Sequence, residues 1–176
     1  MKLSFKTTCV SLVSLLCLYW SAAAKPNRED PTPKKSVEAD VKVEWTMDVN
    51  SMKFPKGPAS GKVAGNEFKL EKAKYDGGTL NIKEQGGRTQ FIIFLFLDKG
   101  ETLDGKIFTI TPDMRNNKNP HIHIHARTKA WALTNNYAMR LEFGGTKDGK
   151  TTGKIYLCLP DMDKTCIAGT IEVAPQ

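Results

Sequence analysis

Two neighbouring segments predict the fold: residues 154–159 have the sequence Lys-Ile-Tyr-Leu-Cys-Leu, and residues 166–173 have the sequence Cys-Ile-Ala-Gly-Thr-Ile-Glu-Val. In each segment the large aliphatic residues fall on alternate positions, which is typical of a β-strand with one face in a core. Between them, residues 160–163 have the sequence Pro-Asp-Met-Asp, which favours a turn. The pair therefore predicts a β-hairpin.

The two cysteines of this hairpin predict its register. If Cys158 lies opposite Cys166, then Leu157 lies opposite Ile167 and the large aliphatic residues share one side. A slip of one residue would send half of them to the other side. The cysteines then face each other on the outer side, within reach of a disulfide. Because the enclosed loop is short, such a bridge would add roughly 2–3 kcal/mol of stability.

The remaining segments extend the same pattern. Alternation at residues 41–48 predicts a half-buried strand, and residues 68–82 predict a hairpin around Asp76-Gly77-Gly78. The apolar run at 91–97 predicts a central strand that is covered on both faces. Residues 107–110 and 139–143 predict further strands. With about eight or nine short strands and no convincing helix, we expect an all-β, single-domain antiparallel sandwich or barrel.

The N-terminal residues predict export. Residues 1–24 combine a basic start, an apolar run and small residues ending at Ala24, the pattern of a cleaved signal peptide. An uncleaved anchor is the alternative, but the apolar run is short for a bilayer, so we expect no membrane span after cleavage. Residues 25–39, rich in proline and charge, predict a flexible linker. The domain would then occupy 40–176 in the periplasm or outside the cell.

The charge of the chain limits its partners. The formal net charge is +7, but the lysines are scattered among acidic residues, without the dense basic run of a nucleic-acid-binding arm. We therefore expect no nucleic-acid partner. Mild basicity suits an anionic polysaccharide or envelope polymer, and an ordinary lysine-rich surface is the alternative. The sequence carries no information on the oligomeric state.

The only three histidines of the chain occupy alternate positions in residues 120–125, Pro-His-Ile-His-Ile-His. On a strand, His121, His123 and His125 would share one face, a common arrangement for zinc or copper ligands. The outer two would lie about 13 Å apart, so two of them plus Glu142 from a neighbouring strand form the better metal site. That site requires the two strands to pair. The alternative is a solvated strand face.

Catalytic motifs are missing from the sequence. No Gly-x-Ser-x-Gly elbow is present, and no phosphate-binding glycine loop leads into a helix. Trp131, Tyr137 and Tyr156 are candidate ligand-binding aromatics, provided that their rings are exposed. The sequence therefore favours an exported, non-catalytic binding or structural module without a cofactor. The alternative is a zinc- or copper-binding protein, or a metalloenzyme, that uses the histidine strand.

Overall fold

The computed structural model describes residues 42–175, which belong to one compact unit spanning Ala39–Gln176. The predicted signal peptide (1–24) and linker (25–39) lie outside the described residues. Within them the chain forms ten β-strands and no helix, which confirms the all-β, antiparallel, single-domain fold. None of the described segments is an apolar helix long enough to cross a membrane. The strands are β1 (Ser60–Val63), β2 (Asn66–Asp76), β3 (Thr79–Glu84), β4 (Gln90–Phe94), β5 (Ile107–Ile110), β6 (His121–Ala126), β7 (Lys129–Leu133), β8 (Ala138–Lys147), β9 (Lys150–Cys158) and β10 (Cys166–Pro175).

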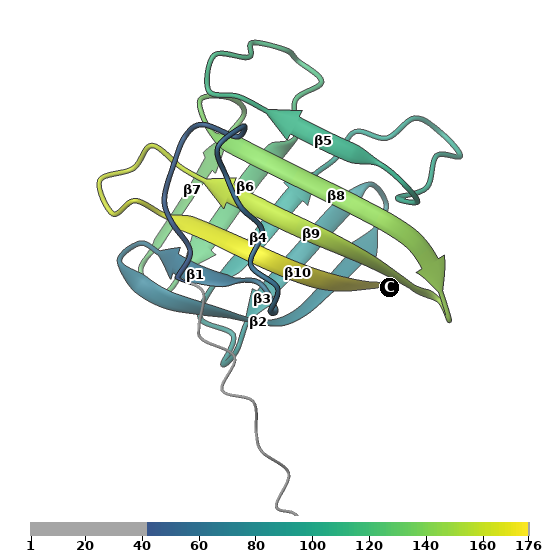
Figure 1. Ribbon diagram of the computed structural model, residues 1–176, viewed down its shortest axis with the longest axis horizontal. Helices are drawn as coiled ribbons and strands as arrows, with labels where there is room; N and C mark the ends of the chain where they lie inside the picture. The colour runs from purple at the N-terminus through teal and green to yellow at the C-terminus, as the bar shows by residue number, and fades with distance from the viewer. Residues whose placement is uncertain (1–41, 176) are drawn as a thin grey trace, which may run out of the picture. The chain divides into compact units, whose positions relative to one another are not determined.

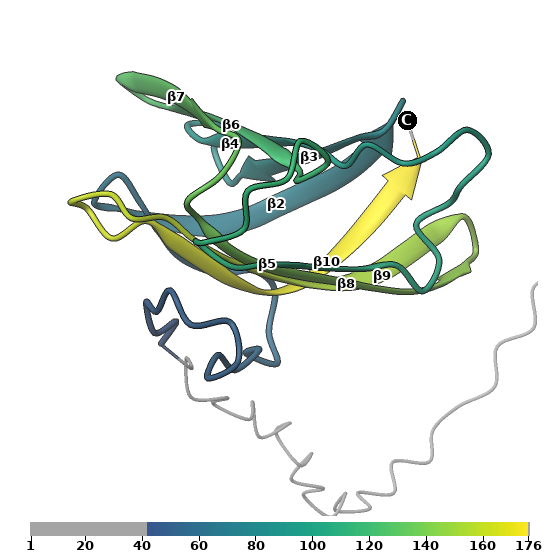
Figure 2. The same cartoon turned by 90° about the horizontal axis from the view of Figure 1, so that it is seen from above.

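The ten strands form a single curled sheet in the order β5-β8-β9-β10-β1-β2-β3-β4-β6-β7 (Figure 1). Seen from above, the curl produces two layers, with β2, β3, β4, β6 and β7 on one side and β5, β8, β9 and β10 on the other (Figure 2). The core fills the space between the layers and includes Phe68, Phe91, Ile124 and Leu141, each at most 1% exposed. Each strand therefore has an inner face in the core and an outer face.

The two layers of the sheet meet at β10, which changes partner along its length. Its first residues, up to Ala168, pair with β1, whereas Val173 pairs in parallel with Ala73 of β2. Gly169 lies between the two halves with a φ of +139°, and a Cβ atom there would lie 2.7 Å from the Cα of Ala59. A residue without a side chain is therefore required where the segment before β1 crosses β10.

The hairpin of β9 and β10 has the predicted register. Cys158 pairs with Cys166, Leu157 with Ile167, and the two cysteines form a disulfide. The aliphatic residues of both strands point into the core, as the alternation requires. The hairpin around Asp76-Gly77-Gly78 is also confirmed, since Asp76 pairs with Thr79.

The predicted strand at 41–48 is wrong for the residues that the structure describes. Residues 43–54, here called the N-terminal strap, cross the outer face of β8, β9 and β10 without joining the sheet (Figure 1). Their apolar side chains pack on Tyr156 and on the disulfide. The Trp45 indole N–H donates to the Leu159 carbonyl at 2.9 Å. The alternation of the strap therefore reflects burial of one side against a finished sheet, not strand pairing.

The prediction that the strand at residues 91–97 is covered on both faces is also wrong. Phe91 and Ile93 point into the core, but Ile92 and Phe94 lie on an outer face that no other segment of the described chain covers, and they remain partly exposed. Strand β4 pairs with β3 and β6 and is buried on one face only. The sheet therefore has an uncovered apolar surface at Ile92 and Phe94.

Replacing Gly169 with alanine should destabilise the protein strongly. The new Cβ would clash with the Ala59 backbone at a φ that suits glycine, so we expect the free energy of unfolding to fall by about 2–4 kcal/mol. Urea denaturation followed by circular dichroism measures this loss. Gly145→Ala is the matched control, because a Cβ there meets no atom within 4 Å. Equal stability of the two variants would contradict the requirement for glycine at this crossing.

Candidate functional site

The three histidines project from β6 onto the outer face of the layer formed by β3, β4, β6 and β7. Ile122 and Ile124 alternate with them and are fully buried, which confirms the predicted shared face of the imidazoles. Strand pairing aligns the outward residues in three rows across the sheet. We call this surface the imidazole face, and its rows are Thr79–Phe94–His121, Asn81–Ile92–His123–Ala132 and Lys83–Gln90–His125–Ala130.

Phenylalanine rings pack against two of the imidazoles. The ring centroids of Phe94 and His123 lie 5.1 Å apart, and those of Phe96 and His121 lie 4.6 Å apart, both edge to face. Phe96 follows β4 and is 49% exposed, although its φ of +48° is unfavourable for a bulky residue. A strained backbone that holds an apolar ring in water is more often found at functional sites than elsewhere.

The imidazole face contains hydrogen-bonding groups but no carboxylate. Within β3, β4, β6 and β7, the rows defined above include Lys83 and two amides, and none of their residues is acidic. Strand β2 borders these rows with two exposed lysines and one exposed carboxylate, since Lys72, Lys74 and Asp76 lie opposite Lys83, Asn81 and Thr79. The Gln90 Nε2 group donates to the side-chain oxygen Oδ1 of Asn81 at 3.1 Å, which orients both amides. The Gln90 side-chain oxygen and the Asn81 NH₂ group can still form hydrogen bonds with a ligand. The face therefore offers apolar rings, amides and imidazoles to a partner, and its one bordering carboxylate, Asp76, lies at the β2 edge.

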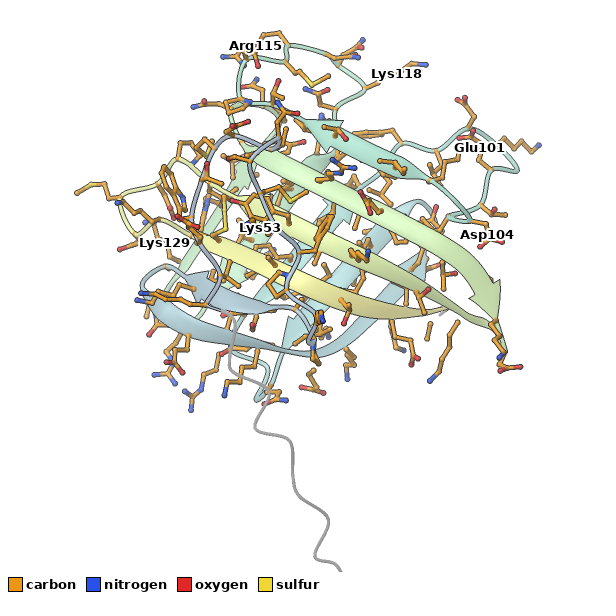
Figure 3. All side chains as sticks on the ribbon, in the orientation of Figure 1. Lys53, Glu101, Asp104, Arg115, Lys118 and Lys129 are labelled. Atoms are coloured by element: carbon orange, nitrogen blue, oxygen red, sulfur yellow. A yellow bond between two sulfur atoms is a disulfide. The ribbon has the colours of Figure 1, made fainter. Side chains whose placement is uncertain are left out.

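A hollow of about 350 Å³ adjoins the imidazole face at His121. Its walls come from the loop between β5 and β6, from the start of β6, and from the loop after β7. Arg115 and Lys118 both lie on the first of these loops (Figure 3), but only Arg115 lines the hollow. The lining residues are Arg115, Asn116, Asn117, His121, Thr134 and Asn135.

The structure does not bring Glu142 to the histidines. Its strand, β8, pairs with β5 and β9, whereas β6 pairs with β4 and β7, so the strand pairing that the predicted metal site required is absent from the described sheet. Glu142 forms an ion pair with Arg140 at 2.7 Å instead. No group of three or more potential metal ligands gathers anywhere in residues 42–175.

Two of the three candidate aromatic residues are buried. Tyr137 is 0% exposed and its hydroxyl donates to the Pro120 carbonyl, whereas Tyr156 is 1% exposed beneath the N-terminal strap. Neither ring has a free face for a ligand, so the expectation that they are exposed is wrong. Trp131 is partly exposed on the edge strand β7, but it lies opposite Ile124 and packs on the core. It therefore points away from the imidazole face.

A larger hollow, of about 660 Å³, lies over β8, β9 and β10 and includes Glu142 and Glu172. Glu71 also lines it, and all three carboxylates are ion-paired: Glu142 with Arg140, Glu172 with Lys150 at 2.6 Å, and Glu71 with Lys72 at 3.3 Å. Its one aromatic lining residue, Phe143, is only 4% exposed. This hollow therefore offers a ligand neither an accessible ring nor an unpaired carboxylate, and we place the candidate site on the imidazole face.

The sequence identified the imidazoles but missed the phenylalanines beside them. Phe94 and Phe96 belong to an apolar run that local periodicity assigns to a strand buried on both faces. Only the pairing of β4 with β6 places them next to the histidines. No signal in the sequence specifies that pairing.

No protein-family model, curated protein or solved structure matches this chain.

The tyrosine beneath the strap should make stability depend on alkaline pH. Burial raises the pKa of Tyr156 above its ordinary value of 10.0, a hydrogen bond to Thr46 lowers it, and Glu44 and Asp48 raise it further. Since the folded pKa exceeds the unfolded one, the stabilisation is complete below pH 10 and is lost as the pH rises through the folded pKa. We expect urea titrations to show constant stability up to about pH 10 and a decline above it.

Tyr156→Phe should weaken that decline and release the strap. The Tyr156 hydroxyl accepts from the Thr46 N–H at 3.0 Å and lies 2.9 Å from the Thr46 carbonyl oxygen, so its loss should cost about 1–2 kcal/mol at neutral pH. Hydrogen exchange in residues 43–54 should accelerate. Tyr137→Phe, which also removes a buried hydroxyl but does not touch the strap, is the control. Unchanged exchange in Tyr156→Phe would refute this role.

Proposed function

We propose that this protein is an exported, non-catalytic binding module that holds a polysaccharide on the imidazole face. One observation carries the proposal: an uncovered sheet surface combines one half-exposed and one partly exposed phenylalanine ring with amides and imidazoles, and it has no carboxylate in its rows across β3, β4, β6 and β7. Sugars need both kinds of contact, because each ring has an apolar face and a rim of hydroxyls. The notable exposure of Phe96 supports the same conclusion.

The geometry suggests how a sugar chain would bind. One sugar ring would stack on Phe96, whose edge-to-face contact with His121 holds its orientation. Hydroxyl groups would bond to the imidazole nitrogens and to the free atoms of the Gln90–Asn81 pair. The exposed alanines of β7, Ala130 and Ala132, leave the histidines accessible from that side. These groups all belong to regular strands or follow one directly, so they are preorganised for a ligand.

Export is part of the proposal. The disulfide of Cys158 and Cys166 fits an oxidising compartment, where such bonds form and persist. The pattern of residues 1–24 favours the same route, to the periplasm or outside the cell. Envelope polysaccharides are abundant in both places, which agrees with the ligand class proposed here.

Phe96→Ala should abolish most of the binding without destabilising the fold. The ring is half exposed, so its removal costs little core packing, but it deletes the stacking surface. Affinity gel electrophoresis against neutral and acidic polysaccharides measures the effect. We expect the wild-type protein to be retarded by at least one polymer, and the variant to bind that polymer about tenfold more weakly, equivalent to about 1.4 kcal/mol.

Ile107→Ala is the matched control, because Ile107 is also an exposed apolar residue (61%) but lies on β5 in the other layer. It should bind as the wild type does. Retardation by none of the polymers, or equal binding by Phe96→Ala and wild type, would contradict the proposal.

Metal binding is the second candidate function, supported by the shared face of the three imidazoles. His123 and His125 occupy neighbouring outward positions and could supply two nitrogen ligands to zinc or copper, with solvent or a partner completing the site. Elemental analysis of protein dialysed against each metal tests this. Stoichiometric metal that is lost in His123→Ala would support it, and metal-free protein would exclude it under those conditions.

A further inference from the structure

The hollow next to His121 presents hydrogen-bond donors. The side chain of Arg115 can only donate, and one of its terminal nitrogens bonds to the Pro112 carbonyl at 2.6 Å, which anchors it. The Oδ1 atom of Asn116 accepts from the Lys118 N–H at 2.9 Å, so the NH₂ group of that amide remains available to donate. The hollow thus combines a guanidinium with amide, hydroxyl and imidazole groups, and no carboxylate lines it.

The loop that carries Arg115 is held in place at several points. Asn119 is 3% exposed, and its side-chain amide donates to the Met114 carbonyl at 3.3 Å. The buried Tyr137 hydroxyl donates to the Pro120 carbonyl at the end of the loop. Asp113 is the only acidic residue between β5 and β6. Its carboxylate accepts from the Thr111 hydroxyl and does not line the hollow.

We propose that this hollow is a subsite for the carboxylate of an acidic sugar, continuous with the polysaccharide site on the imidazole face. This inference rests on the proposed function and names its ligand class. Arg115 would bind the carboxylate through its free guanidinium nitrogens, and Asn116 and Asn135 would donate to its oxygens or to neighbouring hydroxyls. His121 links the two sites, since it lines the hollow and also contacts Phe96.

Size and charge favour this ligand. The hollow, at about 350 Å³, has room for a single sugar residue. A guanidinium with no carboxylate among its lining neighbours disfavours a metal cation and favours an anion. The Asp113 carboxylate, whose pKa is lowered by the hydrogen bond from Thr111 and also by Arg115, does not line the hollow. An acidic sugar would therefore supply the carboxylate that the hollow itself lacks, and the subsite should discriminate by charge.

Arg115→Gln tests the subsite, with polygalacturonate and its methyl ester as probes. These polymers have the same sugar chain with and without the charge. Binding of full-length wild-type protein, measured by isothermal titration calorimetry at physiological salt, should be at least about tenfold stronger for the acid. Arg115→Gln should lose most of this preference, because its affinity for the acid should fall about tenfold and its affinity for the ester should change much less.

Lys118→Gln is the matched control, because Lys118 is a cation on the same loop that does not line the hollow. It should retain the preference for the acid. Equal losses in Arg115→Gln and Lys118→Gln would overturn the subsite, since they would indicate non-specific charge attraction. Displacement of polygalacturonate by inorganic phosphate as readily as by free galacturonate would overturn the carboxylate assignment.

The two proposals fail in different ways. Wild-type protein that binds the ester through Phe96 but shows no preference for the acid would overturn the subsite alone. Wild-type protein that binds neither these probes nor any other polysaccharide would overturn both the subsite and the proposed function.

Discussion

The fold depends on one constraint, the change of partner along β10. This strand pairs with β9 along its length, with β1 at its start and with β2 at its end. Strand β1 lies between β10 and β2 at one end, and β10 pairs directly with β2 at the other, where the sheet curls and brings its two halves face to face (Figure 2). The core forms between these halves, and Gly169 permits the close crossing that the curl requires.

The curled sheet has two outer faces, and only one of them is covered by another described segment of the chain. On the side of β8, β9 and β10, the N-terminal strap covers Tyr156 and the disulfide with its own apolar residues. On the side of β4 and β6, no described segment covers Ile92, Phe94 or Phe96. Burial of apolar surface stabilises a fold at roughly 25 cal/mol per Å², so apolar rings left in water have a cost that a ligand would remove.

In the proposed function, the uncovered face and the hollow beside it would form one continuous recognition surface. The strands place rings and imidazoles in fixed rows, and the loop between β5 and β6 adds a guanidinium at the end of the row that includes His121. Rigid strands would give such a surface its geometry, whereas the proposed subsite on the loop would add charge selectivity. The strained backbone of Phe96 fits this division, since it keeps one ring directed at His121 instead of the core.

Local patterns in the sequence determined the all-β class, the β9–β10 register with its disulfide, and the shared face of the three imidazoles, because period-two alternation acts within a strand and its hairpin partner. Tertiary structure alone decided that β4 pairs with β6 and that β8 places Glu142 elsewhere in the sheet. It also decided that residues 43–54 cover a sheet instead of joining it. The physical reason is that strands distant in the chain pair in the arrangement that buries the most apolar surface over the whole sheet, and no single segment encodes that total. A segment with one apolar side satisfies its local pattern equally well as a strand or as a cover.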